Sequence, residues 1–252
     1  MLKSRVIPVL LIHKNGLVKT FKFEGKKYIG DPINTVKIFN ELEVDEIVIC
    51  DIDSSVHCNE PNYPLIKKIA NECNMPICYA GGIKNVDQVD KIIGFGVEKV
   101  GISSGAFTHK NLIRDSVQRV GSQSVSFIGD IKPKGFSRNY GFFTHNGKKP
   151  QKADLQSTIT EMLDQGVGEI VINFISREGT KSGYDIKFIQ RLKQWIHVPL
   201  TVNGGAGDFN HIKSLIGSVG LVGAGASSIF VFQGKFNAVL ISYPSKLEKE
   251  TL

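Results

Sequence analysis

The sequence predicts an α/β protein in which eight β-α units close into one barrel, and two observations lead to this prediction. Short β-branched runs alternate with longer segments of helical periodicity along all 252 residues, which is the pattern of an α/β fold. Motifs also recur half a chain later at one constant interval: Glu46–Ile49 recurs as Glu169–Ile172, and Gly81-Gly82 as Gly204-Gly205. This repeat favours a single (β/α)8 TIM-barrel domain over 1–252, with half-barrels at about 1–122 and 123–252.

Eight apolar runs are expected to form the strands, because parallel strands covered on both faces read as continuous hydrophobic runs. In order they are Arg5–Ile12, Glu46–Asp51, Pro76–Tyr79, Lys99–Ile102, Ser124–Asp130, Glu169–Phe174, Leu200–Val202 and Gly220–Val222. The amphipathic segments between them are expected to be helices: Ile33–Leu42, Asn62–Asn71, Val86–Ile93, Leu112–Val120, Asp154–Leu163, Ile186–Trp195 and Phe209–Ile216. An open, doubly wound sheet is the alternative, but the half-chain repeat suits closure better.

The composition excludes several classes of protein. Hydrophobic residues make up 41% and charged residues 22%, which is ordinary for a soluble globular domain. No apolar run approaches the ~20 residues that cross a bilayer, and the N-terminus lacks a signal-peptide pattern. We therefore expect no membrane association and a cytoplasmic location. The four cysteines contain no C-x-x-C pair and are expected to be free, buried thiols.

The net charge of +7 does not by itself predict binding to nucleic acid. Lysine and arginine are spread along the chain, and no nucleic-acid-binding motif accompanies them. A phosphorylated small molecule would explain a basic binding site equally well. The histidines have no metal-ligand spacing, so we expect neither a metal nor another cofactor.

Turns rich in glycine and serine follow several strands and predict two anion-binding sites. The first set is Gly82, Ser103 and Ser104, after the third and fourth strands, and the second is Gly205, Ser227 and Ser228, after the seventh and eighth, with Gly179 at its border. Backbone N–H groups at glycines and hydroxyl groups at helix starts bind anions. Tight turns with serine N-caps explain any single motif equally well. Two sets at equivalent positions favour a ligand with two anionic groups.

Over nearly its whole length the chain resembles the cyclase subunit of imidazole glycerol phosphate synthase. The resemblance is carried by Arg5-Val6-Ile7-Pro8, Gly30-Asp31-Pro32, Asp45-Glu46, Ala80-Gly81-Gly82-Ile83, the run from Gly179 to Asp185, and Gly204-Gly205-Ala206-Gly207. It implies a half-symmetric TIM barrel that receives ammonia from a glutaminase subunit docked on its N-terminal face. It also implies a bis-phosphorylated ribonucleotide substrate, cleaved and cyclised at the opposite end.

The same resemblance implies two aspartates that face each other across the mouth as acid and base. Asp130 matches the catalytic position on the fifth strand, whereas the position on the first strand is Leu11, which cannot titrate. His13 shares strand parity with Leu11 and is a candidate substitute. Ser176 and Glu178 stand where the family carries aspartates. The chemistry of the mouth is therefore expected to differ from ordinary cyclisation.

The resemblance further implies a ring of charges at the other end of the barrel that gates the passage of ammonia. It matches Arg5, Glu46, Lys99 and Glu169, each at the start of a strand; a buried structural network is the alternative. A retained ammonia gate beside an altered catalytic pair is similar to a branch found in surface-polysaccharide pathways. There, a glutaminase and the barrel supply ammonia to a third protein, which converts an N-acetyl sugar to an acetamidino sugar. A working histidine-pathway cyclase, a non-catalytic ammonia-conducting scaffold and a phosphosugar isomerase remain alternatives.

Two segments extend beyond the regular β-α units. The stretch from Leu17 to Pro32 looks like the mobile first loop of that branch. Between Lys132 and Lys152, the run Tyr140–Thr144 and the turn that begins at His145 predict a β-hairpin lid, although a solvated excursion is an equally good explanation. Asp51 and Asp53, at the end of the second strand, are expected to orient ligand hydroxyls or to cap the next helix.

Overall fold

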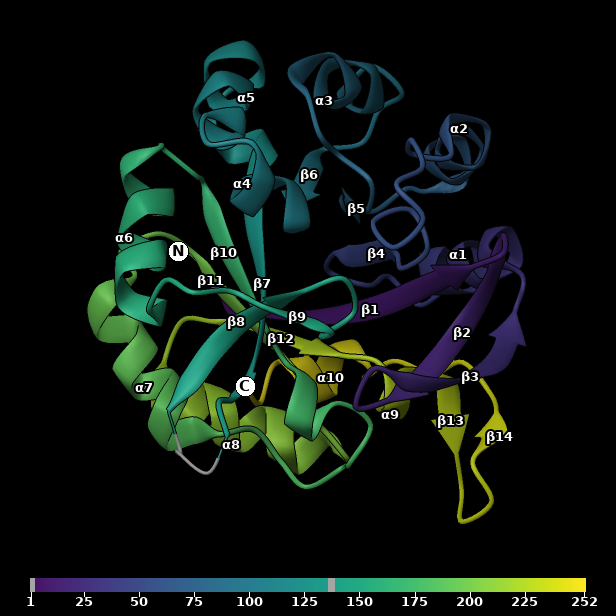
Figure 1. Cartoon of the computed structure of the whole chain (residues 1–252). Helices are drawn as coiled ribbons and strands as arrows, with labels where there is room; N and C mark the ends of the chain where they lie inside the picture. Colours follow the sequence, from purple (N-terminus) through teal and green to yellow (C-terminus); the bar gives the residue numbers. More distant parts are fainter. Residues whose placement is uncertain (1–2, 136–138) are drawn as a thin grey trace.

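The computed structural model describes residues 3–135 and 139–252, and within them eight parallel strands close into a barrel (Figure 1). Around the barrel these strands are β1 (Arg5–His13), β4 (Ile47–Asp51), β5 (Ile77–Ala80), β6 (Lys99–Ile102), β7 (Val125–Pro133), β10 (Glu169–Phe174), β11 (Leu200–Asn203) and β12 (Gly223–Ala226). Closure is completed by the parallel pairings of β12 with β1 and of β7 with β10. The predicted TIM barrel is confirmed, and the open sheet is excluded.

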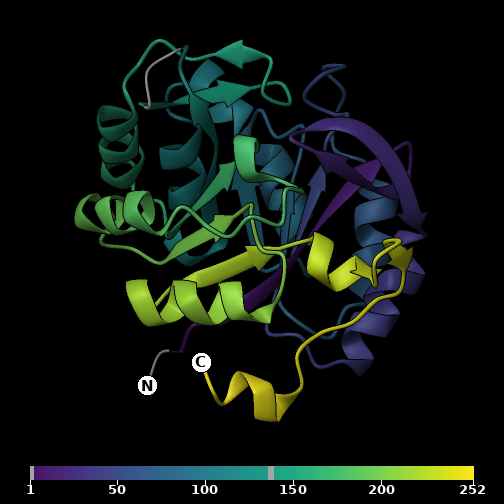
Figure 2. The same ribbon diagram turned by 90° about the horizontal axis from the view of Figure 1, so that it is seen from below.

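All seven predicted helices are present on the outside of the strands (Figure 2). They are α1 (Pro32–Glu41), α2 (Tyr63–Glu72), α3 (Val86–Ile93), α5 (Leu112–Val120), α6 (Leu155–Asp164), α7 (Ile186–Trp195) and α8 (Phe209–Val219). All but α5 begin after an Asp or Asn whose side chain accepts a backbone N–H of the first turn. These caps satisfy donors that have no partner within the helix, and so they fix where each helix starts.

Several shorter elements were not predicted. The short helices α4 (Ser104–Thr108) and α9 (Ser228–Val231) follow β6 and β12, and 3-10 turns lie at Ser122–Ser124 and Ile175–Arg177. Beyond the barrel, β13 (Phe232–Gln233) and β14 (Ala238–Val239) form a small hairpin, and α10 (Lys246–Lys249) follows near the C-terminus.

The apolar core has two parts because alternate residues of each barrel strand point in opposite directions. Outward-facing residues pack against the helices in one large cluster that includes Phe39, Ile92 and Leu192. Inside the barrel, small clusters of Ile7, Val9, Val48 and Cys78, and of Ala80, Ile128 and Val171, share a contact with Cys50. Burying one such large side chain contributes about 1.5–3 kcal/mol. The interior clusters separate the two ends of the barrel.

The eighth strand is Gly223–Ala226, so the predicted strand Gly220–Val222 is wrong. Gly220 instead ends α8 with a φ of 77°. The true strand consists only of glycine and alanine and lacks the bulky pattern that reveals buried strands. Its small residues fit a crowded place, because a Cβ on Gly223 would lie 2.0 Å from Thr201 Oγ1.

The two half-barrels use equivalent glycines in the same way. Gly81, after β5, and Gly204, after β11, have φ angles of 138° and 110°. A Cβ at Gly81 would lie 2.7 Å from Asp51, and one at Gly204 would lie 2.8 Å from the carbonyl oxygen of Phe174. Each glycine thus passes closely over the end of the preceding barrel strand. The sequence repeat corresponds to a repeat in backbone geometry.

Both excursions are hairpins. The stretch expected to be a mobile loop forms β2 (Gly16–Phe21) and β3 (Glu24–Gly30), and β2 pairs with the end of β1. The predicted lid forms β8 (Tyr140–Thr144) and β9 (Lys149–Pro150), and β8 pairs with β7. Part of the predicted lid segment, 136–138, lies outside the described residues. All four cysteines are free, but Cys58 is exposed, so the prediction of buried thiols is wrong there because Cys58 lies in the loop after β4.

Candidate functional site

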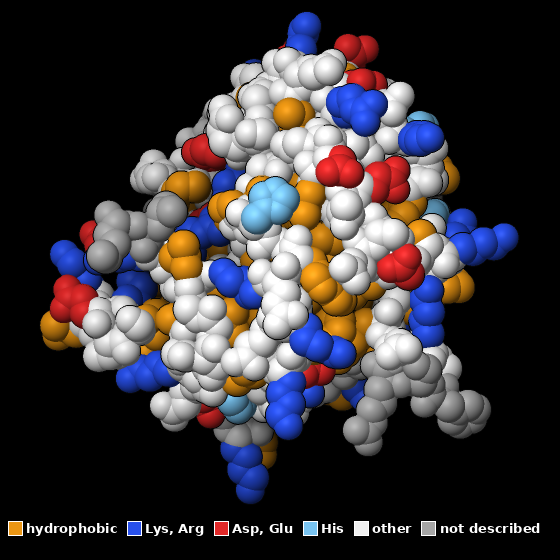
Figure 3. Space-filling view, turned by 90° about the vertical axis from the view of Figure 1, so that its left-hand side faces the viewer, with side chains coloured by type: hydrophobic (Ala, Val, Ile, Leu, Met, Phe, Trp, Pro, Cys, Tyr) orange, Lys and Arg blue, Asp and Glu red, His pale blue; other side chains and the backbone are white. Residues whose placement is uncertain are grey.

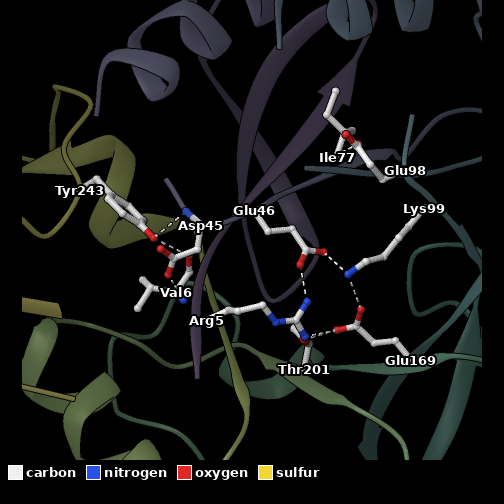
Figure 4. A network of polar contacts seen from close by, with 10 residues as sticks. All are labelled: Arg5, Val6, Asp45, Glu46, Ile77, Glu98, Lys99, Glu169, Thr201 and Tyr243. Carbon is white, nitrogen blue, oxygen red and sulfur yellow. Dashed lines mark hydrogen bonds and ion pairs between the residues drawn. The ribbon is translucent and has the colours of Figure 1, made fainter. Parts of the chain in front are cut away.

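Four charged side chains meet at the N-terminal end of the barrel and form a closed ring (Figure 4). Arg5 binds Glu46 through Nη1 and Glu169 through Nη2, the latter at 2.7 Å. Lys99 Nζ lies 2.7 Å from Glu46 Oε1 and 2.8 Å from Glu169 Oε2. Cations and anions therefore alternate, and each carboxylate has two cationic partners. These are the four residues that the sequence placed at strand starts.

The surroundings favour the charged forms of Lys99 and Glu169. Burial alone lowers the pKa of Lys99, but the carboxylates of Glu169 and Glu46 outweigh it and raise that pKa. Burial opposes ionisation of Glu169 as well, yet Lys99 and Arg5 hold its pKa below the ordinary value. Thr201 Oγ1 donates to Glu169 at 2.6 Å. The inner clusters that include Ile7 and Val48 lie in the barrel interior beyond the ring, so the charges are confined to one end.

The ring is held next to a second polar contact set, which the sequence did not predict (Figure 4). Val6 N–H donates to Asp45 Oδ2 at 2.9 Å, and Tyr243 O–H donates to the carbonyl oxygen of Val6 at 2.7 Å. Lys249 Nζ lies 2.7 Å from Asp45 Oδ1. The C-terminal segment thereby ties together the starts of β1 and β4, where Arg5 begins β1 and Glu46 immediately precedes β4.

A cavity opens at the opposite end of the barrel, and Asp130 lies in its wall together with Leu11. Asn173 Nδ2 donates to Asp130 Oδ1 at 2.7 Å, and Asn203 Nδ2 donates to Asn173 Oδ1 at 3.2 Å. Burial raises the pKa of Asp130 to about 6, although the hydrogen bond from Asn173 opposes the rise. This carboxyl group can therefore exchange a proton near neutral pH. The sequence did not predict the two asparagines as site residues, because only their alternation along the strands indicated that they face the barrel interior.

His13, the predicted substitute for the missing aspartate, is not part of this wall. Its Nδ1 lies 2.7 Å from Asp53 Oδ1, and the backbone N–H of Lys14 also donates to Asp53. Asp51 lines the cavity but accepts N–H groups of Asp53 and Ser54. Asp51 therefore caps the turn after β4, and Asp53 binds His13. The sequence had predicted that these aspartates orient ligand hydroxyls or cap the next helix.

The first predicted anion site lies in the same cavity. Gly82, Ser103 and Ser104 all contribute to its wall. Gly82 has a φ of 71°, and a Cβ there would lie 2.8 Å from Ser54 Cβ, so the turn alone requires glycine. Ser103, however, precedes α4 without making a side-chain cap hydrogen bond. Its hydroxyl group is therefore not used for helix capping.

The second predicted anion site forms an adjoining cavity. Its wall includes Gly179, Gly205, Ser227 and Ser228. Ser227 precedes α9 and, like Ser103, makes no side-chain cap hydrogen bond. The structure thus brings each predicted set together, on opposite halves of the barrel mouth.

Lys19 and Glu178 form a buried ion pair in the wall shared by the two cavities. Thr20 Oγ1 donates to Glu178 Oε2 at 3.1 Å, and the N–H of Lys22 donates to the Glu178 carbonyl at 3.0 Å. Burial lowers the pKa of Lys19 to about 7. The pair fastens the β2–β3 hairpin to the loop after β10. The sequence feature that could have indicated this ion pair is a lysine directly after the apolar residues Leu17 and Val18 in a buried strand.

Other features set limits on the site. In the described ranges, no group of three or more His, Cys, Asp or Glu side chains is arranged to hold a metal ion. No helix among the described residues has the length and apolar character to cross a membrane. On the face drawn in Figure 3, lysines and arginines lie scattered among other side chains and do not form one basic patch.

The family model described as Histidine biosynthesis protein matches residues 5–237. A protein of Leptospira borgpetersenii, provisionally named imidazole glycerol phosphate synthase subunit HisF, is 47% identical over 252 residues, which cover 100% of this chain and 99% of that relative. The chain belongs to the HisF family. A Vibrio vulnificus relative, provisionally named subunit hisF3 of the same synthase, is 50% identical over 250 residues, covering 99% of this chain and 96% of the relative.

Similarity to another HisF protein is lower. The imidazole glycerol phosphate synthase subunit HisF of Streptococcus mutans is 30% identical over 250 residues, with 99% of this chain and 98% of the relative covered. The chain is thus a HisF-like protein over its full length, and it is more similar to the provisionally named relatives above than to this one.

Proposed function

We propose that this HisF-like chain is the ammonia-using subunit of a glutamine amidotransferase complex, specialised for converting an N-acetyl sugar to an acetamidino sugar in surface-polysaccharide synthesis. The observation that carries the proposal is the combination of a complete ionic ring at one end with Leu11 in place of a titratable residue at the other. A glutaminase partner docks on the N-terminal face, and a third, sugar-modifying protein completes the complex.

The ring supports a role in admitting ammonia. Its two cations and two anions neutralise one another, so an uncharged molecule meets no net charge at this end of the barrel. The next layer contains Ile7, Val48 and Cys78. Moving an ion into such apolar surroundings costs far more than moving a neutral molecule. The arrangement favours ammonia over ammonium.

The residues at the mouth support an ammonia acceptor other than the ribonucleotide of the imidazole reaction. Leu11 removes one of the two carboxyl groups that the ordinary cyclisation uses, while Asp130 remains in the wall. Both serine- and glycine-rich sets are present, and they favour a phosphorylated ligand with anionic groups on both sides of the mouth. The higher identity to the provisionally named relatives is in line with a specialised branch.

The acceptor is tested with the purified chain, an ammonium salt and the bis-phosphorylated ribonucleotide of the imidazole reaction. We expect negligible turnover. Turnover at the rate of ordinary cyclases that Asp130→Asn abolishes, and that the exposed control Asp164→Asn leaves intact, would refute the sugar assignment. It would establish the histidine-pathway cyclase, for which the two anion sites are the favourable observation.

The nitrogen route is tested in the complex with glutaminase and sugar-modifying partner, supplied with either glutamine or ammonium. Lys99→Met is expected to lower product formation from glutamine about tenfold or more, and to leave formation from ammonium unchanged. Arg119→Met, which breaks the exposed pair with Asp90, is the matched control. Equal rates for Lys99→Met and wild type with glutamine would contradict the proposed ammonia route.

A further inference from the structure

Six titratable side chains line the mouth cavity, and most of them are already committed to other contacts. They are Lys19, Cys50, Asp51, Asp130, His145 and Glu178. Lys19 and Glu178 bind each other, and Asp51 caps the turn after β4. Burial raises the pKa of the Cys50 thiol to about 12, so it stays protonated. Asp130 and His145 are left as groups that can exchange protons near neutral pH.

The turn that carries His145 is fixed in a costly conformation. His145, Asn146 and Gly147 have φ angles of 53°, 55° and 75°, and a non-glycine residue in this region costs roughly 1–2 kcal/mol. Asn146 Nδ2 donates to the carbonyl oxygen of Ile52 at 2.9 Å, and Lys132 Nζ donates to that of Gly147 at 2.8 Å. The turn is thus held from the loop after β4 and from β7.

The imidazole ring is also oriented. His145 Nδ1 lies 3.0 Å from Thr144 Oγ1, and Gln151 Nε2 donates to the same oxygen at 3.0 Å. Since Gln151 supplies one hydrogen, the Thr144 hydroxyl hydrogen is available to His145 Nδ1. This arrangement favours the imidazole with its proton on Nε2, the nitrogen left for a ligand.

We propose that His145 and Asp130 form the acid–base pair of this mouth, with His145 on the lid hairpin taking the place of the carboxylate absent at Leu11. The inference rests on the proposed function in one respect, that ammonia is the nucleophile. It gives His145 the role for which the sequence offered His13, which lies outside the cavity wall.

Burial shifts the two proton affinities toward each other. Burial, and then the neighbouring charge of Lys149, lower the pKa of His145, while burial raises that of Asp130 to about 6. Among the described residues, the other charged groups around the turn and cavity include Lys132 on β7, Asp51 at the end of β4, and the Lys19–Glu178 pair. These shifts favour a form of the pair that holds one proton.

The one-proton form supports addition of ammonia to a carbonyl carbon. The nitrogen lone pair forms the C–N bond, and the carbonyl π electrons move to oxygen. That oxygen takes the Nε2 proton of the His145 imidazolium, and the nitrogen gives one proton to the Asp130 carboxylate. The product is a tetrahedral carbon that carries one hydroxyl and one amino group. Asp130 then returns its proton to the hydroxyl group, which leaves as water while a nitrogen lone pair forms the C=N bond of the amidinium product, and His145 regains a proton from solvent.

The first test is an NMR titration of the histidine rings in the purified chain, which needs neither ammonia nor a partner. Asp130→Asn removes a negative charge from the cavity that His145 also lines and is expected to lower the pKa of His145. His197, exposed and preceding β11 at the opposite end of the barrel, is the internal control. A His145 titration that Asp130→Asn leaves unchanged overturns the pair.

The second test measures product formation by the complete complex supplied with ammonium, which bypasses the ring. His145→Gln and Asp130→Asn are each expected to lower kcat at least about tenfold and to remove one limb of a bell-shaped pH profile; His197→Gln is the matched control. Full rate and an unchanged profile in His145→Gln overturn the inference, whatever Lys99→Met does with glutamine. Loss of rate in His145→Gln while Lys99→Met stays fully active with glutamine supports the pair and contradicts the delivery route.

Discussion

Replacing Lys99 with methionine tests the physical basis of the ring most directly. In the wild type, Lys99 Nζ contacts both Glu46 and Glu169, and their side chains are 4% and 7% exposed. Methionine fills a similar volume but leaves each carboxylate with Arg5 alone as its cationic partner. The ring would then carry a net negative charge in a site that water reaches poorly.

Removing one partner of a buried ionic group costs about 3–5 kcal/mol of folding free energy, and that is the destabilisation expected for Lys99→Met. Urea unfolding followed by far-ultraviolet circular dichroism measures it. Arg119→Met breaks an ion pair whose side chains are 60% and 46% exposed, and it is expected to leave the urea midpoint nearly unchanged.

The double variant Lys99→Met with Glu46→Gln restores charge balance, so its loss should be smaller than the sum of the two single losses. If Lys99→Met unfolds at the same urea concentration as wild type, the ring is not ionised and coupled in the way the contacts indicate.

Three further outcomes can be checked by the same unfolding measurement. The raised pKa of Asp130, about 6, means that the folded state holds this proton more tightly than the unfolded state. Stability from this group is therefore present at low pH and is lost as pH rises through about 6; Asp130→Asn should stabilise the chain by about 2–3 kcal/mol near pH 8 and by little near pH 4. An Asp130→Asn variant with no such pH dependence of the stability change would contradict the raised pKa of Asp130. Gly223→Ala should destabilise by about 1–3 kcal/mol, because its Cβ would lie 2.0 Å from Thr201 Oγ1, and an unchanged midpoint would show that β12 has room. Gly217→Ala on α8, where a Cβ would meet nothing within 4 Å, should instead stabilise by about 0.5–1 kcal/mol, and a loss of stability would argue against an open helical position there.

Residues at fixed positions on barrel strands could be predicted from the sequence. Arg5, Lys99 and Glu169 each start a strand and Glu46 immediately precedes one, and closure of the barrel brings strand starts together whatever the loops do. Asp130 likewise follows from its place at the end of the fifth strand. Strand periodicity and barrel geometry suffice for both groups, because neighbouring strands in a closed barrel have only one way to meet.

Contacts made by hairpins could not be predicted in this way. Lys19 and Glu178 are 159 positions apart and meet only because the β2–β3 hairpin folds over the mouth. His145 reaches the cavity because its turn adopts three positive φ angles, whereas His13, with the right strand parity, is held by Asp53. The eighth strand was misplaced because glycine and alanine carry no size signal.

The tie between Tyr243 and Val6 spans 237 positions, and it has a consequence for biosynthesis. The strand that carries Arg5 leaves the ribosome well before Tyr243, whose side chain holds the start of that strand. A nascent chain therefore lacks this contact until Tyr243 has been made, and contacts of such long sequence separation form slowly. Proteolysis after β14 would remove Tyr243 from the folded molecule and leave the start of β1 without this contact.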